Sequence, residues 1–378
     1  MDNNVLDSDS ERLSPFVTFH TVVGVPQHLS ASRALVNGEI HGPTTVVWDR
    51  GVIVDVRAAK RGDDVIDGIL SPGFIDAQVN GVGADRVADP HCDWNRISQM
   101  LRSQGVTTWL PTVPTQEPEF YRSAHSEWLS GIASVERDLP DALGFHFEGP
   151  LLGQKPGAHR AEWFDVTRDV LNTLRTARMV TLAPEHPLSR DATHELSEAG
   201  VLVALGHTSA SQEQYDLCVE DGARHVTHLF NAMSGVDHVE PGVATYALTD
   251  DRVTFSVVGD LIHVHPTTIN LIWRAANARM TLVSDQVGEQ SRTGMVPGAR
   301  LAGSTTGLDA AVRNLVTKCR IPLADVLVMA TERPASILRL VDRGTLRVGS
   351  RADLVVLTDD LGVRTVVCAG FSTTISGN

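Results

Sequence analysis

Three residues of the sequence have the types and positions of a metal site: Glu148, His207 and His228. Each follows directly on a short apolar run, in the segments LGFHFEGP, VLVALGHT and HVTHLFN. One carboxylate and two imidazoles form a donor set that suits Zn²⁺, Fe²⁺ or another divalent first-row ion and leaves a position open for water. Any one of these side chains alone could be a hydrogen-bonded core residue. Because they recur at equivalent positions, we predict that together they bind a divalent ion.

The elements around these residues alternate between strand and helix patterns. In 93–105 the apolar residues share one helical face, with Asp93 as a suitable N-cap, and a later helix is capped by Ser209 or Ser211. Strands that alternate with helices form a parallel sheet, because each parallel pair needs a crossover. Eight such units predict an α/β fold, a (β/α)₈ TIM barrel, and an open doubly wound sheet is the alternative. The expected strands are 72–80, 107–113, 143–150, 180–185, 201–208, 225–231, 253–260 and 280–286.

The chemically capable residues concentrate at the ends of these strands. Seven of the eight expected strands end in such a residue. One of the seven ends in Asp260, with His263 just beyond, and Glu185, at the end of another, is expected to orient a neighbouring residue. A barrel builds its active site from the carboxyl ends of its strands, whereas a core strand has no use for a carboxylate there. The sequence therefore predicts one active site at that mouth. The other six runs end in Gln78 with Asn80, Glu148, Glu185, His207, His228 and Asp285.

The two ends of the chain have a different pattern of short strands. Residues 1–14 are expected to form a disordered tail. A tight Asp49-Arg50-Gly51 turn between apolar runs predicts a hairpin, and the C-terminal residues continue in Val-rich strands. We predict a small β-domain from 15–70 together with 340–378, and a barrel domain over 71–339.

Composition limits the class of protein further. The net charge is −14 and no Lys/Arg-rich run occurs, which argues against a nucleic-acid partner. Four scattered cysteines without a CxxC pair are typical of reduced thiols. The acidic N-terminus does not have the pattern of a signal peptide, and no apolar run approaches the roughly 20 residues of a membrane span. We expect a soluble cytoplasmic enzyme with no membrane partner.

The motifs around these residues resemble those of the N-acetylglucosamine-6-phosphate deacetylase family, within the amidohydrolase superfamily. They occur in order over nearly the whole chain, and HFEGP, GHTSAS and THLFNAM together are specific. The resemblance implies a TIM barrel joined to a small β-sandwich domain built from both chain ends, in a homodimer. The matching segments include LSPGFIDAQVNGVG, HFEGPLL, GAH, LAPE, GHTSAS, THLFNAM, EPG, GDLIHV, LVSD, LAGST and GTLRVGSRADLVVL.

The resemblance also implies the reaction and the role of each matching residue. The reaction is hydrolysis of the N-acetyl amide of an amino sugar, giving glucosamine 6-phosphate and acetate from N-acetylglucosamine 6-phosphate. Gln78 and Asn80 replace the HxH pair with which other superfamily members bind a second metal, which implies a single ion. The implied roles are metal ligation by Glu148, His207 and His228, proton transfer by Asp285, polarisation of the substrate carbonyl by His159, and substrate contacts by Asn231, Ala232, His263, Gln78 and Asn80.

Two departures from the family pattern concern the substrate. Val239 stands where the family has an arginine that binds the phosphate, and valine cannot make that bidentate contact. The segment after Asp285 is short, and Arg292 or Arg300 within it could replace the missing arginine or be a solvated loop charge. An unphosphorylated or differently decorated N-acyl amino sugar is therefore the alternative substrate. A barrel kept only for binding or regulation is a third reading, which the intact set of ligands disfavours.

Overall fold

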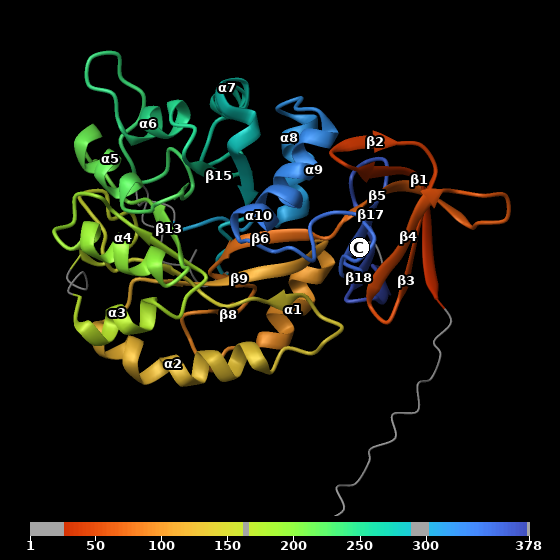
Figure 1. Ribbon diagram of the computed structural model, residues 1–378, viewed down its shortest axis with the longest axis horizontal. Coiled ribbons are helices and arrows are strands. Elements are labelled where there is room, and N and C mark those ends of the chain that lie inside the picture. Colours follow the sequence, from red (N-terminus) through yellow and green to blue (C-terminus); the bar gives the residue numbers. More distant parts are fainter. Residues whose placement is uncertain (1–25, 162–165, 289–301, 376–378) are drawn as a thin grey trace, which may run out of the picture.

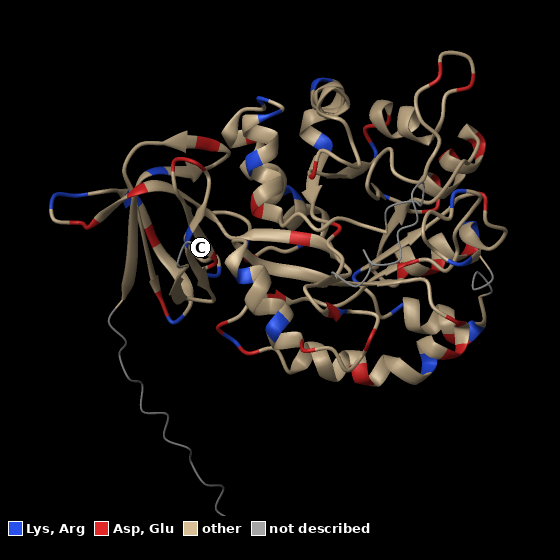
Figure 2. Cartoon of the chain, turned by 180° about the vertical axis from the view of Figure 1, so that it is seen from behind, with Lys and Arg blue, Asp and Glu red and all other residues tan. Residues whose placement is uncertain are grey.

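The computed structural model describes residues 26–161, 166–288 and 302–375. The expected disordered tail and both candidate arginines, Arg292 and Arg300, lie outside these residues. Among the described helices, none is both long and apolar enough to cross a bilayer. Lys and Arg positions are dispersed along the elements and interleaved with Asp and Glu (Figure 2).

The middle of the chain forms the predicted barrel (Figure 1). Its strands are parallel and hydrogen-bonded in chain order, and a bridge from Val79 to Gln286 joins the first strand to the segment after the last. This closure confirms the barrel and excludes the open doubly wound sheet. The short β10 (Asp141–Ala142) also pairs with β9, and β7 (Gly81–Val82) pairs with β8 (Asp85–Arg86). The barrel strands are β6 (Phe74–Val79), β9 (Val106–Pro114), β11 (His146–Glu148), β12 (Met179–Leu182), β13 (Leu202–Leu205), β14 (His225–Val226), β15 (Thr254–Val258) and β16 (Met280–Val283).

Helices surround the barrel and bury their apolar faces on it (Figure 1). Both helix starts examined in the sequence are confirmed: the side chain of Asp93 accepts a hydrogen bond from the N–H of Arg96, and Ser211 with Gln214 forms a capping box. The largest cluster of buried apolar residues lies between these helices and the strands. The helices are α1 (Trp94–Ser103), α2 (Pro118–Ala133), α3 (Arg168–Leu174), α4 (Ser189–Glu198), α5 (Gln212–Glu220), α6 (Val243–Thr249), α7 (Pro266–Ala276), α8 (Leu308–Thr317), α9 (Leu323–Ala330) and α10 (Glu332–Ile337).

Strands from both chain ends share a second sheet, drawn in red and blue in Figure 1. The predicted hairpin is present, with Arg50 and Gly51 both at positive φ in the turn between β3 and β4. A Cβ on Gly51 would lie 2.5 Å from the carbonyl oxygen of Ala369, so this turn requires glycine. The exact division into domains stays a prediction. The strands are β1 (Gln27–Val36), β2 (Glu39–His41), β3 (Thr44–Asp49), β4 (Val52–Ala58), β5 (Val65–Pro72), β17 (Leu354–Leu357), β18 (Val363–Cys368) and β19 (Phe371–Thr374).

Two histidines inside the barrel are buried in their neutral form. The Nε2 atom of His146 lies 2.7 Å from the hydroxyl of Thr181, and the Nδ1 atom of His225 lies 2.8 Å from the hydroxyl of Thr254. Burial lowers the pKa of His146 to about 4 and that of His225 to about 3. An unfolded chain binds a proton at each of these positions below its ordinary pKa near 6.5, whereas the folded chain does not.

These histidines should make the fold sensitive to mild acid. Because the unfolded state binds more protons, the free energy of unfolding should fall on going from pH 7 to pH 5, by about 2 kcal/mol for each histidine. Urea unfolding of chelator-treated protein at pH 7, 6 and 5 measures this. His225→Asn, which keeps a polar atom near Thr254, should lose about half of the dependence, whereas exposed His194→Asn should keep it. An unchanged pH dependence in His225→Asn would contradict the assignment.

Candidate active site

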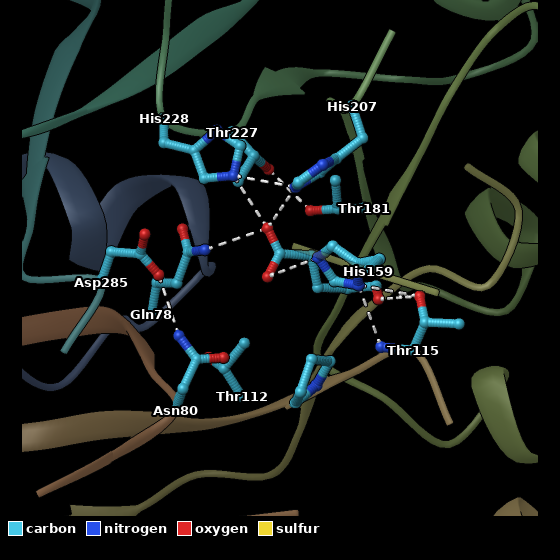
Figure 3. A network of polar contacts seen from close by, with 12 residues as sticks. Gln78, Asn80, Thr112, Thr115, His159, Thr181, His207, Thr227, His228 and Asp285 are labelled. Carbon is cyan, nitrogen blue, oxygen red and sulfur yellow. Dashed lines mark hydrogen bonds and ion pairs between the residues drawn. The ribbon is translucent and has the colours of Figure 1, made fainter. Parts of the chain in front are cut away.

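The three predicted ligand side chains meet at the carboxyl ends of the barrel strands, and Figure 3 shows His207 and His228 pointing toward one another there. The Oε1 atom of Glu148 lies 2.9 Å from Nε2 of His207 and 2.8 Å from Nε2 of His228. The two Nε2 atoms are 3.2 Å apart. All three residues are buried. Strands β11, β13 and β14, far apart in sequence, therefore bring together the donor atoms that the sequence predicted.

The hydrogen bond between His207 and Lys155 leaves Nε2 of His207 as the ring atom that can bind a cation. The Nδ1 atom of His207 lies 3.2 Å from the carbonyl oxygen of Lys155, which can only accept, so Nδ1 carries the proton. Nε2 then faces Oε1 of Glu148 at 2.9 Å, a contact that is favourable only with a proton or a metal ion between the two atoms. Ligands of a tetrahedral zinc ion are separated by roughly 3.3 Å, as follows from zinc–nitrogen distances near 2.0 Å. The arrangement fits a divalent ion.

A fourth side chain, His159, also approaches this cluster. Ligand atoms of Glu148, His159 and His207 lie within 4.8 Å of one another, so His159 competes with His228 for the place of third ligand. However, the backbone N–H of Thr115 donates to Nδ1 of His159 at 3.2 Å. The proton of neutral His159 must then be on Nε2, which lies 3.6 Å from Oε2 of Glu148 and has no lone pair for a metal. The geometry favours His228 as the ligand and His159 as an N–H donor.

Three of the four residues predicted to bind the metal or transfer the proton have a backbone conformation that residues other than glycine rarely adopt. His207, His228 and Asp285 have φ angles of 51°, 33° and 49°. Left-handed conformations of this kind cost free energy and persist where the surrounding structure enforces them, commonly at functional sites. Each strand thus turns sharply at its functional residue. Nothing in the sequence analysis anticipated this strain.

The pKa values of the two acids of the site, Glu148 and Asp285, are shifted in opposite directions. Burial favours the neutral form of Glu148, but hydrogen bonds from His159, His207 and His228 outweigh it and hold its pKa well below the ordinary value. Burial raises the pKa of Asp285, and the negative charge of Glu148 raises it further. Two carboxyl groups whose pKa values are shifted apart in this way are typical of sites that need one permanent anion and one group that carries a proton.

The two amides predicted to contact substrate lie against these acids, and their substrate contact stays a prediction. The Nδ2 atom of Asn80 donates to Oδ1 of Asp285 at 2.9 Å, and Nε2 of Gln78 lies 3.3 Å from Oε1 of Glu148. Both contacts orient a carboxylate (Figure 3). Thr115 was missed in the sequence, although its position just beyond the strand expected at 107–113 was a usable signal.

A cavity of about 420 Å³ opens over the cluster. Asn231, Ala232 and His263, for which substrate contact stays a prediction, line it, and Nδ1 of His263 lies 2.7 Å from Oδ2 of Asp260. Among the described residues that line this cavity, Lys155 is the only lysine or arginine. Val239 lines a separate depression and is 71% exposed. The cavity can therefore hold a small polar molecule with its reacting bond over the cluster.

The barrel and this cluster define the class of protein. The chain belongs to the amidohydrolase family, whose model matches residues 69–372 and whose members are metal-dependent hydrolases of carbon–nitrogen bonds. Individual relatives agree with the motifs found in the sequence. The N-acetylglucosamine-6-phosphate deacetylase of Danio rerio is 32% identical, over 88% of this chain and 90% of that protein. An N-acetylgalactosamine-6-phosphate deacetylase of Shewanella is also 32% identical, over 90% of this chain and 94% of that protein.

A solved structure matches most of the chain. The crystal structure of N-acetyl-D-glucosamine-6-phosphate deacetylase from Mycobacterium smegmatis has a TM-score of 0.83 and 30% identity, and the match covers 92% of this chain and 100% of that one. The barrel and the additional sheet are thus shared with a deacetylase of known structure.

Removing single histidines should identify the third ligand. We expect His228→Ala to bind less than a tenth of the metal bound by the wild type, because only two of three donors remain. His159→Ala should keep nearly full metal content, since its Nε2 carries a proton. Metal analysis of dialysed protein by plasma mass spectrometry measures both, with His194→Ala as an exposed control. The reverse result, with metal lost from His159→Ala and kept in His228→Ala, would assign the ligands the other way.

Proposed function

We propose that this enzyme hydrolyses the N-acetyl amide of an amino sugar, with N-acetylglucosamine 6-phosphate as its substrate and glucosamine 6-phosphate and acetate as products. The observation that carries the proposal is the convergence of Glu148, His207 and His228 beside a second acid, Asp285, whose pKa is raised. The substrate class is supported by relatives that are named as deacetylases of N-acetylhexosamine 6-phosphates. A mutant of the Mycobacterium smegmatis enzyme was solved in complex with N-acetyl-D-glucosamine-6-phosphate.

Each side chain has a defined part in this reaction. A divalent ion held by Glu148, His207 and His228 would act as a Lewis acid, which acidifies water and polarises the amide carbonyl. Asp285 accepts the proton of the attacking water and returns it to the nitrogen of the leaving amine. The water oxygen forms the new bond to the acyl carbon as the carbon–nitrogen bond breaks. The water oxygen ends in acetate, one water proton ends on the free amine, and the second is released to solvent.

Three further residues prepare these groups for the transition state. His159 donates its Nε2–H to the carbonyl oxygen as that oxygen gains negative charge, and Thr115 holds the ring in the required tautomer. Asn80 fixes one oxygen of Asp285 by its 2.9 Å hydrogen bond, which leaves the other oxygen for proton transfer. A neutral donor and an oriented base are thus built into the fold before substrate arrives.

The proposal also includes the identity of the metal ion and the oligomeric state of the protein. One carboxylate with two imidazoles favours a single Zn²⁺, and Fe²⁺ or another divalent first-row ion is compatible with the same donors. Homodimer formation and a cytoplasmic location stay predictions from the sequence.

An unphosphorylated N-acyl amino sugar is the second candidate substrate. The exposed Val239 favours it, because the family's arginine is absent there and the side chain lies outside the cavity. Lys155 supports the first candidate, since it brings one positive charge to the cavity. The two candidates share every catalytic residue and differ only in recognition of the sugar.

A comparison of two substrates tests the proposal. On protein of known metal content, kcat/KM for acetate release should be at least 100-fold higher with N-acetylglucosamine 6-phosphate than with N-acetylglucosamine, because a charge-assisted contact to phosphate contributes about 3 kcal/mol. Equal values would favour the second candidate. Release of acetate from neither sugar would remove the deacetylase assignment.

Replacing the proton-transferring acid should separate chemistry from metal binding. Asp285→Asn is expected to lower kcat by at least 1,000-fold, because an amide cannot accept the proton, a role typically worth 10²- to 10⁴-fold. Metal content should stay near that of the wild type. The exposed Asp251→Asn serves as the control for one lost negative charge. Turnover of Asp285→Asn within tenfold of wild type would remove Asp285 from the mechanism.

A further inference from the structure

Strand β12 contributes no ligand, although it lies between two strands that do. In the barrel it pairs with β11, which ends at Glu148, and with β13, which leads to His207. Glu185 follows β12 at the same mouth of the barrel and is partly buried. Glu185 therefore lies between the two strands that lead to Glu148 and His207.

Both oxygens of Glu185 bind the segments that follow these neighbouring strands. Oε1 accepts from the backbone N–H of Ser209 at 2.9 Å and from that of Gln154 at 3.2 Å. Oε2 accepts from the hydroxyl of Thr208, the residue next to His207. A single carboxylate therefore connects the segment after Glu148 to the segment after His207.

The same two segments contact each other at the metal site. The backbone N–H of Gly153 donates to the carbonyl of His207 at 3.1 Å, and Nδ1–H of His207 donates to the carbonyl of Lys155 at 3.2 Å. A Cβ on Gly153 would lie 2.0 Å from Oε1 of Glu185, so the chain passes directly over this carboxylate. The carbonyl that fixes the proton of His207 thus belongs to a segment that Glu185 holds in place.

We propose that Glu185 is a positioning residue for the metal site. Its carboxylate fixes residues 153–155 against the end of β13, so that Lys155 retains the Nδ1–H of His207 and the Nε2 lone pair is directed at the ion. Partners that orient a histidine ligand in this way typically change metal affinity by 10- to 100-fold. The inference rests on the proposed metal ligands and is independent of the identity of the sugar.

Metal affinity of two Glu185 variants tests this role. Zinc dissociation constants of the full chain, measured by competition with a chromophoric chelator, should rise 10- to 100-fold in Glu185→Ala. Glu185→Gln should recover most of the affinity, because its amide oxygen still accepts from the N–H groups of Ser209 and Gln154. Glu198→Ala, an exposed glutamate at the end of α4, should bind zinc like the wild type. With saturating zinc, kcat of Glu185→Ala should return to within threefold of wild type.

A purely structural role predicts different results. In that case the metal-free Glu185→Ala protein would melt at a much lower temperature than metal-free wild type, and Glu185→Gln would not restore zinc affinity. Either of these results, or wild-type zinc affinity in Glu185→Ala, would overturn the inference. Absence of deacetylase activity in zinc-loaded wild type would instead refute the proposed function, and the zinc measurements would stand unaffected.

Discussion

The enforced proximity of one carboxylate and two imidazole nitrogens is the constraint on which the site depends. Glu148, His207 and His228 place three lone-pair atoms within 3.2 Å of one another in a buried position. Such an arrangement is repulsive unless a proton or a metal ion lies between the atoms, and burial removes the water that would screen it. The surrounding fold must therefore hold these side chains, and it does so by strained backbone at two of them. A bound ion would convert this repulsion into the favourable interaction that organises the site.

The charges and protons of the residues around this cluster are arranged so that each residue has one chemical role. Glu148 stays an anion because three imidazoles contact it, whereas burial and the charge of Glu148 raise the pKa of Asp285. The N–H of Thr115 makes His159 a neutral donor and removes it as a ligand. The pH sensitivity expected of the fold has its origin elsewhere, in His146 and His225 inside the barrel. Catalytic and structural histidines are thus distinguished by their hydrogen-bond partners.

The barrel explains why residues of such different sequence separation can cooperate. Parallel strands place all their carboxyl ends at one mouth, so that β11, β13, β14 and the segment after β16 each contribute one group. The strand between two of them, β12, contributes a carboxylate that binds neighbouring loops in place of a metal. The departures from the family pattern that the sequence shows, Val239 and the short segment after Asp285, lie beyond the strand ends.

The sequence by itself determined the strand–helix rhythm, the helix cap at Asp93, the hairpin at Gly51 and the identity of the three metal-binding candidates, and it limited a second cap to Ser209 or Ser211. Each of these follows from local spacing or from the position of a residue in its strand, which are properties of neighbouring residues. Closure of the barrel, the tautomers of His159 and His207, the separation of the two acids' pKa values and the contacts of Glu185 were decided only by the tertiary structure. Each of them depends on atoms brought together from distant segments, such as Thr115 with His159 or Asn80 with Asp285, and no local pattern encodes the distance between such atoms.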